Sequence, residues 1–329
     1  MPRIDVEAIE DEWEEDHHLL ARRSRELSQA ARATIDRLEA ARVVAVDRGR
    51  VTILLDGEVV DATLAGTMRG TKAVVGDHVR VRPARHANDL PRIVEVLPRT
   101  TVLTRTGDDA LDDERVVVAN ADAIAVVVAA ENLTMGIRFL DRVLVAASVG
   151  GLLAMVVVNK VDLLTDRSVV DEVLERYAAI GVEVHATSAL TGEGLDELGR
   201  SLTGAWTAFT GHSGVGKSAL FNRLVPEADR EVGAMGRYGG RHTTVSALAM
   251  PIISLDAWLI DTPGVRSFGL GGLAPRELAR HFPELAALRC ALDDCIHDGE
   301  PGCRLAEAAI HPERLAAYRR LLASLRGEG

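Results

Sequence analysis

The sequence predicts a multidomain protein: an N-terminal OB-fold β-barrel, a central α/β P-loop domain with circularly permuted elements, and a mostly helical C-terminal domain. Residues 41–100 alternate apolar and polar positions between Gly and Asp turns, as small antiparallel barrels do. Residues 211–218 fit the phosphate-loop pattern G-x-x-x-x-G-K-[ST], and all 3 cysteines fall within residues 290–303. We therefore place an acidic, helical extension at 1–40, the barrel at 41–100, the P-loop domain at 101–268 and the C-terminal domain at 269–329.

Length and composition agree with a globular protein of two or three domains. The chain has 329 residues, of which 47% are hydrophobic and 26% are charged. Its net charge of −11 argues against a general polyanion binder, so any contact with nucleic acid must use local basic patches. The acidic start does not resemble a secretory signal, and the few cysteines suit a reducing compartment. The apolar run 143–158 is split by Gly150-Gly151 and reads as helix, turn and strand. We expect a cytoplasmic monomer with no membrane or DNA partner.

The central domain contains a predicted phosphate-binding loop at residues 211–218. Glycines let the backbone turn its N–H groups toward an anion, and the helix that follows adds its positive end. AWTAFTG reads as the buried strand before the loop and KSALFNRLV as the helix after it. Lys217 is expected to reach the β- and γ-phosphates and the Ser218 hydroxyl to coordinate Mg²⁺. The loop residues are Gly211, His212, Ser213, Gly214, Val215, Gly216, Lys217 and Ser218.

Two further segments predict that the base is guanine. Asn159-Lys160-Val161-Asp162 follows a strand-like run, and an aspartate there accepts hydrogen bonds from the N1–H and 2-amino group of guanine, which adenine lacks. Lys160 can lay its aliphatic stem along the base. Thr187-Ser188-Ala189 follows the next strand-like run, and the backbone N–H groups of Ser188 and Ala189 are expected near guanine O6. Together these segments predict a guanine-nucleotide site.

The magnesium side of the site is predicted from Asp261-Thr262-Pro263-Gly264, which follows the strand-like AWLI. Asp261 is expected to hold the metal through water, and the Gly264 N–H to contact the γ-phosphate. A threonine from the glycine-rich segment 233–245 should close over the metal. Thr243 and Thr244 are equally suited, so the magnesium set is Ser218, Asp261 and Thr243, with Thr244 as the alternative.

These elements occur in a rotated order, because the base segments precede the phosphate loop. A new starting point leaves a three-dimensional site intact when the original termini lie close together. The rotation also means that DTPGVRSFGL, which should respond to the γ-phosphate, leads directly into the C-terminal domain. A nucleotide-dependent shift there could move that domain.

The C-terminal domain carries a predicted structural zinc site. Cys290, Cys295, His297 and Cys303 are spaced C-x4-C-x-H-x5-C, and three thiolates with one imidazole complete a tetrahedral site. A region this small needs such a cross-link. The final helix carries Arg314, Arg319, Arg320 and Arg326, which are interpreted as a solvated surface or as RNA contacts.

The predicted barrel is more basic than the chain as a whole. Residues 41–100 contain ten Lys and Arg against seven Asp and Glu, and no Phe, Trp or Tyr. Base stacking is therefore unavailable, and RNA binding there would use phosphate contacts and shape. Docking of the barrel on its neighbours alone is the alternative.

The ordered set of motifs resembles the RsgA (YjeQ) family of circularly permuted, ribosome-associated GTPases. The resemblance covers roughly residues 41–329: the OB-like domain, the motifs NKVD, TSA, GHSGVGKS, RHTT and DTPG, and the zinc module. It implies a GTP hydrolase that uses Mg²⁺ and one structural Zn²⁺, binds the 30S ribosomal subunit and its 16S rRNA, assists late maturation of that subunit and leaves after hydrolysis to GDP. Two features depart from the resemblance: Val245 replaces the third threonine of the common H-T-T-T sequence, and the N-terminal tail is acidic, whereas some members carry a basic one.

The residue after DTPG bears on turnover. Many GTPases place a water-orienting glutamine there, whereas this chain has Val265, whose aliphatic side chain cannot orient water. We expect slow intrinsic turnover, with His242 or a ribosomal group orienting the water in the complex. The alternative function is a nucleotide-gated RNA-binding switch with little turnover; NKVD and TSA disfavour a P-loop kinase or ATPase. The predicted catalytic set is Lys217, Ser218, His242, Thr243, Thr244, Asp261 and Gly264.

Overall fold

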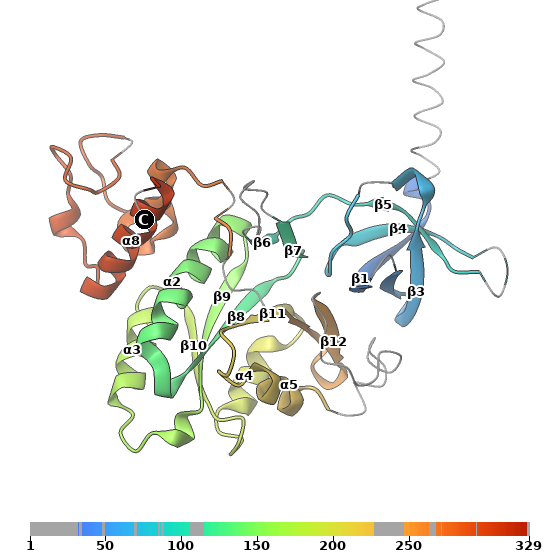
Figure 1. The fold of residues 1–329 in the computed structure, drawn as a ribbon, viewed down its shortest axis with the longest axis horizontal. Coiled ribbons are helices and arrows are strands. Elements are labelled where there is room, and N and C mark those ends of the chain that lie inside the picture. The colour runs from blue at the N-terminus through green and yellow to red at the C-terminus, as the bar shows by residue number, and fades with distance from the viewer. Residues whose placement is uncertain are drawn as a thin grey trace, which may run out of the picture.

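The computed structural model shows a β-barrel at one end, a central α/β sheet, and a mostly helical C-terminal region at the other end (Figure 1). It describes residues 32, 35–47, 50–68, 71–84, 86, 89–105, 115–226, 247–262, 268–270, 272–293 and 295–327. The predicted multidomain architecture is confirmed. Within the described ranges, every helix is too short or too polar to span a bilayer.

The barrel has five strands: β1 (Glu39–Asp47), β2 (Arg50–Leu55), β3 (Glu58–Leu64), β4 (His78–Arg82) and β5 (Arg92–Val96). Their order is β1-β2-β3-β5-β4, and β4 pairs back with β1, so the barrel is closed and leaves no free edge. Strands β3 and β5 are parallel and the other pairs are antiparallel. The alternating pattern places Val43, Ile53, Val79, Val81 and Ile93 in the barrel core.

The central sheet has the order β10-β9-β8-β11-β13-β12. Its parallel strands are β8 (Ala123–Ala129), β9 (Leu153–Asn159), β10 (Glu183–Thr187), β11 (Trp206–Thr210) and β13 (Ala257–Asp261). The edge strand β12 (Leu248–Ile252) is antiparallel to β13. A separate hairpin of β6 (Val102–Arg105) and β7 (Arg115–Ala119) joins the barrel to this sheet.

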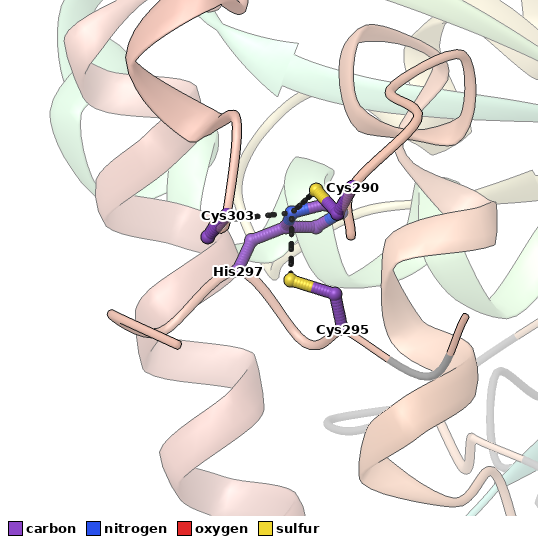
Figure 2. Close-up of side chains that lie close together, drawn as sticks. All are labelled: Cys290, Cys295, His297 and Cys303. Carbon is purple, nitrogen blue, oxygen red and sulfur yellow. Dashed lines mark hydrogen bonds between the residues drawn. The ribbon is translucent and has the colours of Figure 1, made fainter. Parts of the chain in front are cut away.

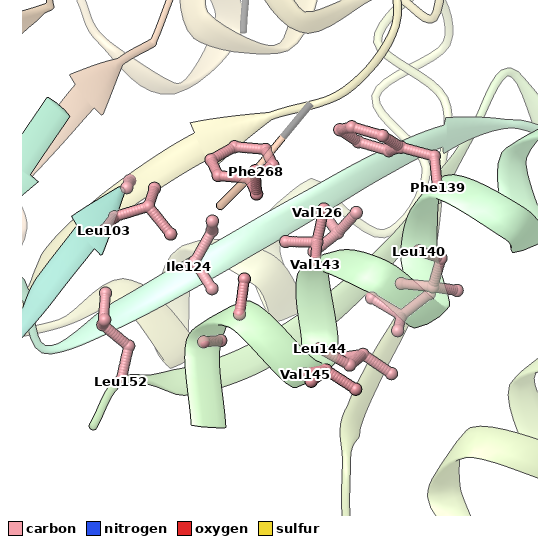
Figure 3. Close-up of a cluster of buried hydrophobic side chains, with 14 of the residues drawn as sticks. Leu103, Ile124, Val126, Phe139, Leu140, Val143, Leu144, Val145, Leu152 and Phe268 are labelled. Carbon is pink, nitrogen blue, oxygen red and sulfur yellow. The ribbon is translucent and has the colours of Figure 1, made fainter. Parts of the chain in front are cut away.

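Helices cover both faces of the central sheet. Alternate residues of β8, such as Ile124 and Val126, face α2 (Leu133–Gly150) (Figure 3). On the same side of the sheet, α3 (Ser168–Ala178) packs on β9 and β10. The intervening residues of β8, such as Ala125 and Val127, face α4 (Leu195–Leu202) and α5 (Lys217–Leu224). The predicted reading of 143–158 is also confirmed, because α2 ends before a left-handed Gly151 and β9 begins at Leu153.

Buried polar contacts connect the barrel to the central sheet. The Arg42 guanidinium lies 3.6 Å from the ring centroid of Trp206 and donates a hydrogen bond to the Asn120 carbonyl. Asn120 adopts φ 51°, donates to the Gly76 carbonyl at 3.1 Å, and accepts from the Thr100 N–H at 2.8 Å. These contacts fix the orientation of the barrel, and β1 also pairs with β12 at its edge.

The C-terminal region contains α7 (Pro283–Ala286), α8 (Pro312–Leu325) and two 3₁₀ helices, η6 (Pro275–His281) and η7 (Leu305–Glu307). Its attachment to the central domain is a buried network centred on Arg314 of α8. Arg314 donates to Asp141 of α2 at 2.8 Å and to Glu284 of α7 at 2.9 Å, and the Tyr177 hydroxyl of α3 donates to Asp141 at 2.9 Å. The sequence interpretation of Arg314 as solvated or RNA-facing is wrong, because its side chain is only 2% exposed.

Candidate nucleotide and metal sites

The sheet brings the predicted nucleotide residues to one edge. Asn159 at the end of β9 pairs in register with Thr187 at the end of β10, and Phe209 of β11 pairs with Asp261 at the end of β13. The carboxyl ends of all five parallel strands therefore lie on the same side, where α/β sheets bind their ligands. Since β8 and β11 lie between β9 and β13, the phosphate loop after β11 occupies the middle of this edge.

The phosphate loop has the backbone shape that its glycines predict. Gly211, Gly214 and Gly216 have φ values of 153°, 85° and 93°, which side chains disfavour. A Cβ on Gly211 would lie 2.3 Å from the Val127 carbonyl oxygen of the neighbouring strand. The Lys217 ammonium donates to the carbonyls of Gly211 at 2.5 Å and His212 at 3.2 Å. Lys217, the first residue of α5, thus bonds back to the first two residues of the loop.

Lys217, the first residue of α5, and Asp261, the last residue of β13, lie close enough for their charges to interact. Burial lowers the pKa of Lys217 from its ordinary value, and the Asp261 carboxylate opposes this change. Burial raises the pKa of Asp261, while the Lys217 charge and the Thr262 N–H oppose it. The Thr262 hydroxyl donates to the Phe209 carbonyl at 2.7 Å and so fixes the chain just after Asp261.

Asn159 connects the base segments to the phosphate loop. Its side-chain amide donates to the Val215 carbonyl at 3.0 Å, and its oxygen accepts from the Ala189 N–H at 3.1 Å and the Thr187 hydroxyl at 3.3 Å. The side chain is buried, so each of these bonds is sheltered from water. One residue therefore holds together three segments that are far apart in the sequence.

Asp162 and Lys160 are also held by neighbours. The Ser188 hydroxyl donates to Asp162 Oδ1 at 2.5 Å and accepts from the Thr191 N–H at 3.1 Å. Lys160 adopts φ 66°, and its Nζ lies 2.6 Å from Glu131 Oε1. Glu131 belongs to no recognisable motif, so no sequence pattern pointed to it. Its contact with Lys160 follows only from the adjacency of β8 and β9.

The remaining predicted nucleotide-site residues are either exposed or lie outside the described residues. Ser213 and Ser218 are exposed on the loop, and the His212 ring lies 4.5 Å from the Phe139 ring of α2. Four predicted catalytic residues, His242, Thr243, Thr244 and Gly264, together with Val265, lie outside the described residues. Their predicted roles stay predictions.

The predicted zinc ligands form one cluster (Figure 2). His297 Nδ1 lies 3.6, 3.7 and 3.5 Å from the sulfurs of Cys290, Cys295 and Cys303, and all four atoms lie within 4.8 Å of one another. Tetrahedral zinc, with Zn–S near ~2.3 Å and Zn–N near ~2.0 Å, places sulfur and nitrogen about 3.5 Å apart. The donor set and its spacing therefore fit Zn²⁺.

The backbone around the cluster supports this geometry. His297 has φ 56°, which turns its ring toward the sulfurs. The Glu300 carboxylate accepts from the N–H groups of Ile296 at 2.8 Å and Asp298 at 2.7 Å, which holds the turn on both sides of His297. Burial lowers the pKa of His297 and favours the neutral imidazole that a metal ligand requires.

Comparisons with known proteins agree with this architecture. Residues 96–271 match the family model described as RsgA GTPase. The chain is 39% identical over 285 residues to the small ribosomal subunit biogenesis GTPase RsgA of Gemmatimonas aurantiaca, covering 82% of this chain and 92% of that protein. It is 39% identical over 266 residues to the protein of the same name from Alcanivorax borkumensis, covering 78% and 74%.

Two solved structures are also similar. YjeQ from Thermotoga maritima aligns with a TM-score of 0.72 and 29% identity, covering 88% of this chain and 99% of that one. The circularly permuted GTPase YloQ aligns with a TM-score of 0.68 over 90% and 97% of the two chains, and at 21% identity it supports the fold alone.

Proposed function

Because the chain belongs to the RsgA GTPase family and is a GTP hydrolase, we propose that it binds the small ribosomal subunit and assists its late maturation. Hydrolysis of GTP to GDP and phosphate is stimulated by the subunit and coupled to release. The observation that carries the guanine-nucleotide assignment is the bonding of Asn159 to both Ala189 and Val215, which joins the base segments to the phosphate loop. Relatives named for small ribosomal subunit biogenesis support the choice of partner.

Each residue has a proposed task in nucleotide binding. Asp162, oriented by Ser188, accepts the N1–H and 2-amino group of guanine. The N–H groups of Ser188 and Ala189 bind O6 by sharing hydrogens that they donate to the Glu193 carbonyl and to Asn159 Oδ1 in the structure. The backbone of residues 211–218 binds the phosphates, and Lys217 exchanges its loop carbonyls for phosphate oxygens. Exchanging neutral carbonyl acceptors for anionic phosphate oxygens is favourable because the hydrogen bonds then join opposite charges, which adds coulombic attraction.

The proposed Mg²⁺ site uses oxygen donors, as the ion requires. The Ser218 hydroxyl, from the first turn of α5, and the Asp261 carboxylate, at the end of β13, would hold the ion, with Thr243 or Thr244 as the third protein ligand. When bound, Mg²⁺ neutralises charge on the β- and γ-phosphate oxygens. His242 or a ribosomal group orients the attacking water; if His242→Ala retained full ribosome-stimulated turnover, His242 would have no such role.

A row of arginines on the barrel supports contact with 16S rRNA. Arg50 pairs in register with Thr63, Thr63 with Arg92, and Arg92 with Arg82, so the three arginines share the outer face of adjacent strands. All three are exposed, and within the described residues none forms an ion pair. Like charges side by side repel one another, and an RNA backbone would relieve this repulsion.

We propose that the protein acts on the small ribosomal subunit in the cytoplasm, as a monomer.

Single-turnover GTP hydrolysis with and without purified 30S and 50S subunits tests the proposal. Stimulation by 30S but not 50S subunits is the expected result. Binding to 30S subunits in the GTP state without any stimulation would instead favour the nucleotide-gated RNA-binding switch. Equal stimulation by both subunits would refute the assignment to the small subunit.

A further inference from the structure

Glu131 occupies a central position at the nucleotide edge of the sheet. It lies in the 3₁₀ helix η2 (Ala130–Asn132), directly after β8, the strand between β9 with the base segment and β11 with the phosphate loop. Its carboxylate accepts from Lys160 Nζ at 2.6 Å. The two side chains are 41% and 30% exposed, so the pair borders solvent and does not belong to the core.

The ion pair constrains a side chain that the nucleotide must meet. Lys160 leaves β9 with φ 66°, and its Cε lies 3.9 Å from the position that a Cβ on Gly216 would occupy. The lysine stem therefore passes beside the phosphate loop on its way to Glu131. A free lysine side chain has several rotatable bonds, and fixing it on ligand binding costs rotamer entropy.

We infer that Glu131 is a positioning residue for guanine-nucleotide binding. Its carboxylate anchors the Lys160 ammonium, so that the aliphatic stem already lies where the face of the purine packs. This lowers the entropy lost on binding, as preorganisation does in general. Because the stem contacts the base, which does not react, the effect is equal in the ground state and the transition state. The inference rests on the proposed role of Lys160 in nucleotide binding.

The chemistry of the contact predicts a distinctive specificity. The lysine stem packs on the face of the purine, whereas Asp162 recognises its edge. Loss of Glu131 therefore weakens GTP and inosine triphosphate, which lacks the 2-amino group, by the same factor. A general loosening of the base segments would instead disturb Asp162 and reduce the preference for GTP over inosine triphosphate.

A double-mutant cycle tests the inference with the full-length protein. Equilibrium binding of GDP, GTP and inosine triphosphate is measured for wild type, Glu131→Gln, Lys160→Met and the double variant, together with kcat and KM for GTP. Because exposed ion pairs are weak, Glu131→Gln should lower the affinity for each nucleotide by about 1.4- to 5-fold and raise KM with kcat unchanged. The double variant should bind no more weakly than Lys160→Met alone.

Glu193→Gln is the matched control, since it removes a comparably exposed ion pair with Arg167 beside the base segments without touching Lys160. Its nucleotide affinity should equal that of wild type. Three results would each overturn the inference and leave the proposed function standing. Glu131→Gln could bind nucleotide as tightly as wild type while Lys160→Met binds it more weakly. Glu193→Gln could lose as much affinity as Glu131→Gln, or Glu131→Gln could change the ratio of GTP to inosine triphosphate affinity. A wild-type protein that bound no guanine nucleotide would overturn both.

Discussion

Replacing Arg314 with methionine should destabilise the C-terminal region strongly and in a pH-dependent way. Arg314 is 2% exposed and bridges Asp141 and Glu284, whose side chains are 2% and 6% exposed. Methionine fills similar volume but removes the guanidinium that donates hydrogen bonds to both buried carboxylates. Breaking a buried ion pair in this manner costs roughly 3–5 kcal/mol. At pH 8 we expect a loss of that size in the free energy of unfolding of α8.

The pH dependence follows from Asp141. Burial raises its pKa above the ordinary value, although the charge and hydrogen bond of Arg314 and the Tyr177 hydroxyl oppose this shift. When a carboxyl has a higher pKa in the folded state than in the unfolded state, the native state holds its proton longer as the pH rises. The free energy of unfolding therefore falls between the unfolded and the folded pKa. Without Arg314 the folded pKa rises further, so the cost of Arg314→Met should shrink as the solution is acidified.

Hydrogen exchange of α8 at several pH values, after correction for the intrinsic exchange rate, measures this local stability. Exchange through opening of α8 should be roughly 150 to 5,000 times faster at pH 8 in the variant. Adding Asp141→Asn to Arg314→Met should restore part of the loss at pH 8, since the amide remains neutral. A loss below about 1 kcal/mol at pH 8, or one that did not change on acidification, would show that the Arg314 network does not hold the region in place.

Three further variants test the nucleotide, zinc and RNA sites. Asp162→Asn should shift the preference between GTP and xanthosine triphosphate by on the order of 10³-fold, because an asparagine amide can donate to the 2-oxo group; competition binding measures this, and an unchanged preference would remove Asp162 from the base site. Metal analysis should find one zinc per chain, and Cys295→Ser should lose it and speed exchange around residues 290–303 while GDP binding persists; retention of zinc by the variant would argue against the four-ligand site. Arg82→Gln with Arg92→Gln should lower the salt slope of 30S binding by about one to two and leave intrinsic hydrolysis unchanged, whereas an unaltered slope would exclude the arginine row from the RNA contact.

Local sequence features were sufficient to predict the elements that surround the site. The glycines of residues 211–218 require unusual backbone angles, and the C-x4-C-x-H-x5-C spacing allows four ligands to converge within a short loop. Alternating apolar positions in residues 41–100 predicted a closed barrel, since each strand must turn one face inward. These signals depend only on residues close together in the chain.

Contacts between distant segments were decided by the tertiary structure. The order β9-β8-β11 places Glu131 beside Lys160 and lets Asn159 reach the phosphate loop, and no spacing in the sequence encodes that order. The packing of α8 against α2 likewise turned Arg314 from an apparent surface cation into a buried ion-pair partner. The ion-pair partner of a charged side chain depends on which residues lie near it and on how deeply it is buried. Both are set only when the strands and helices pack together.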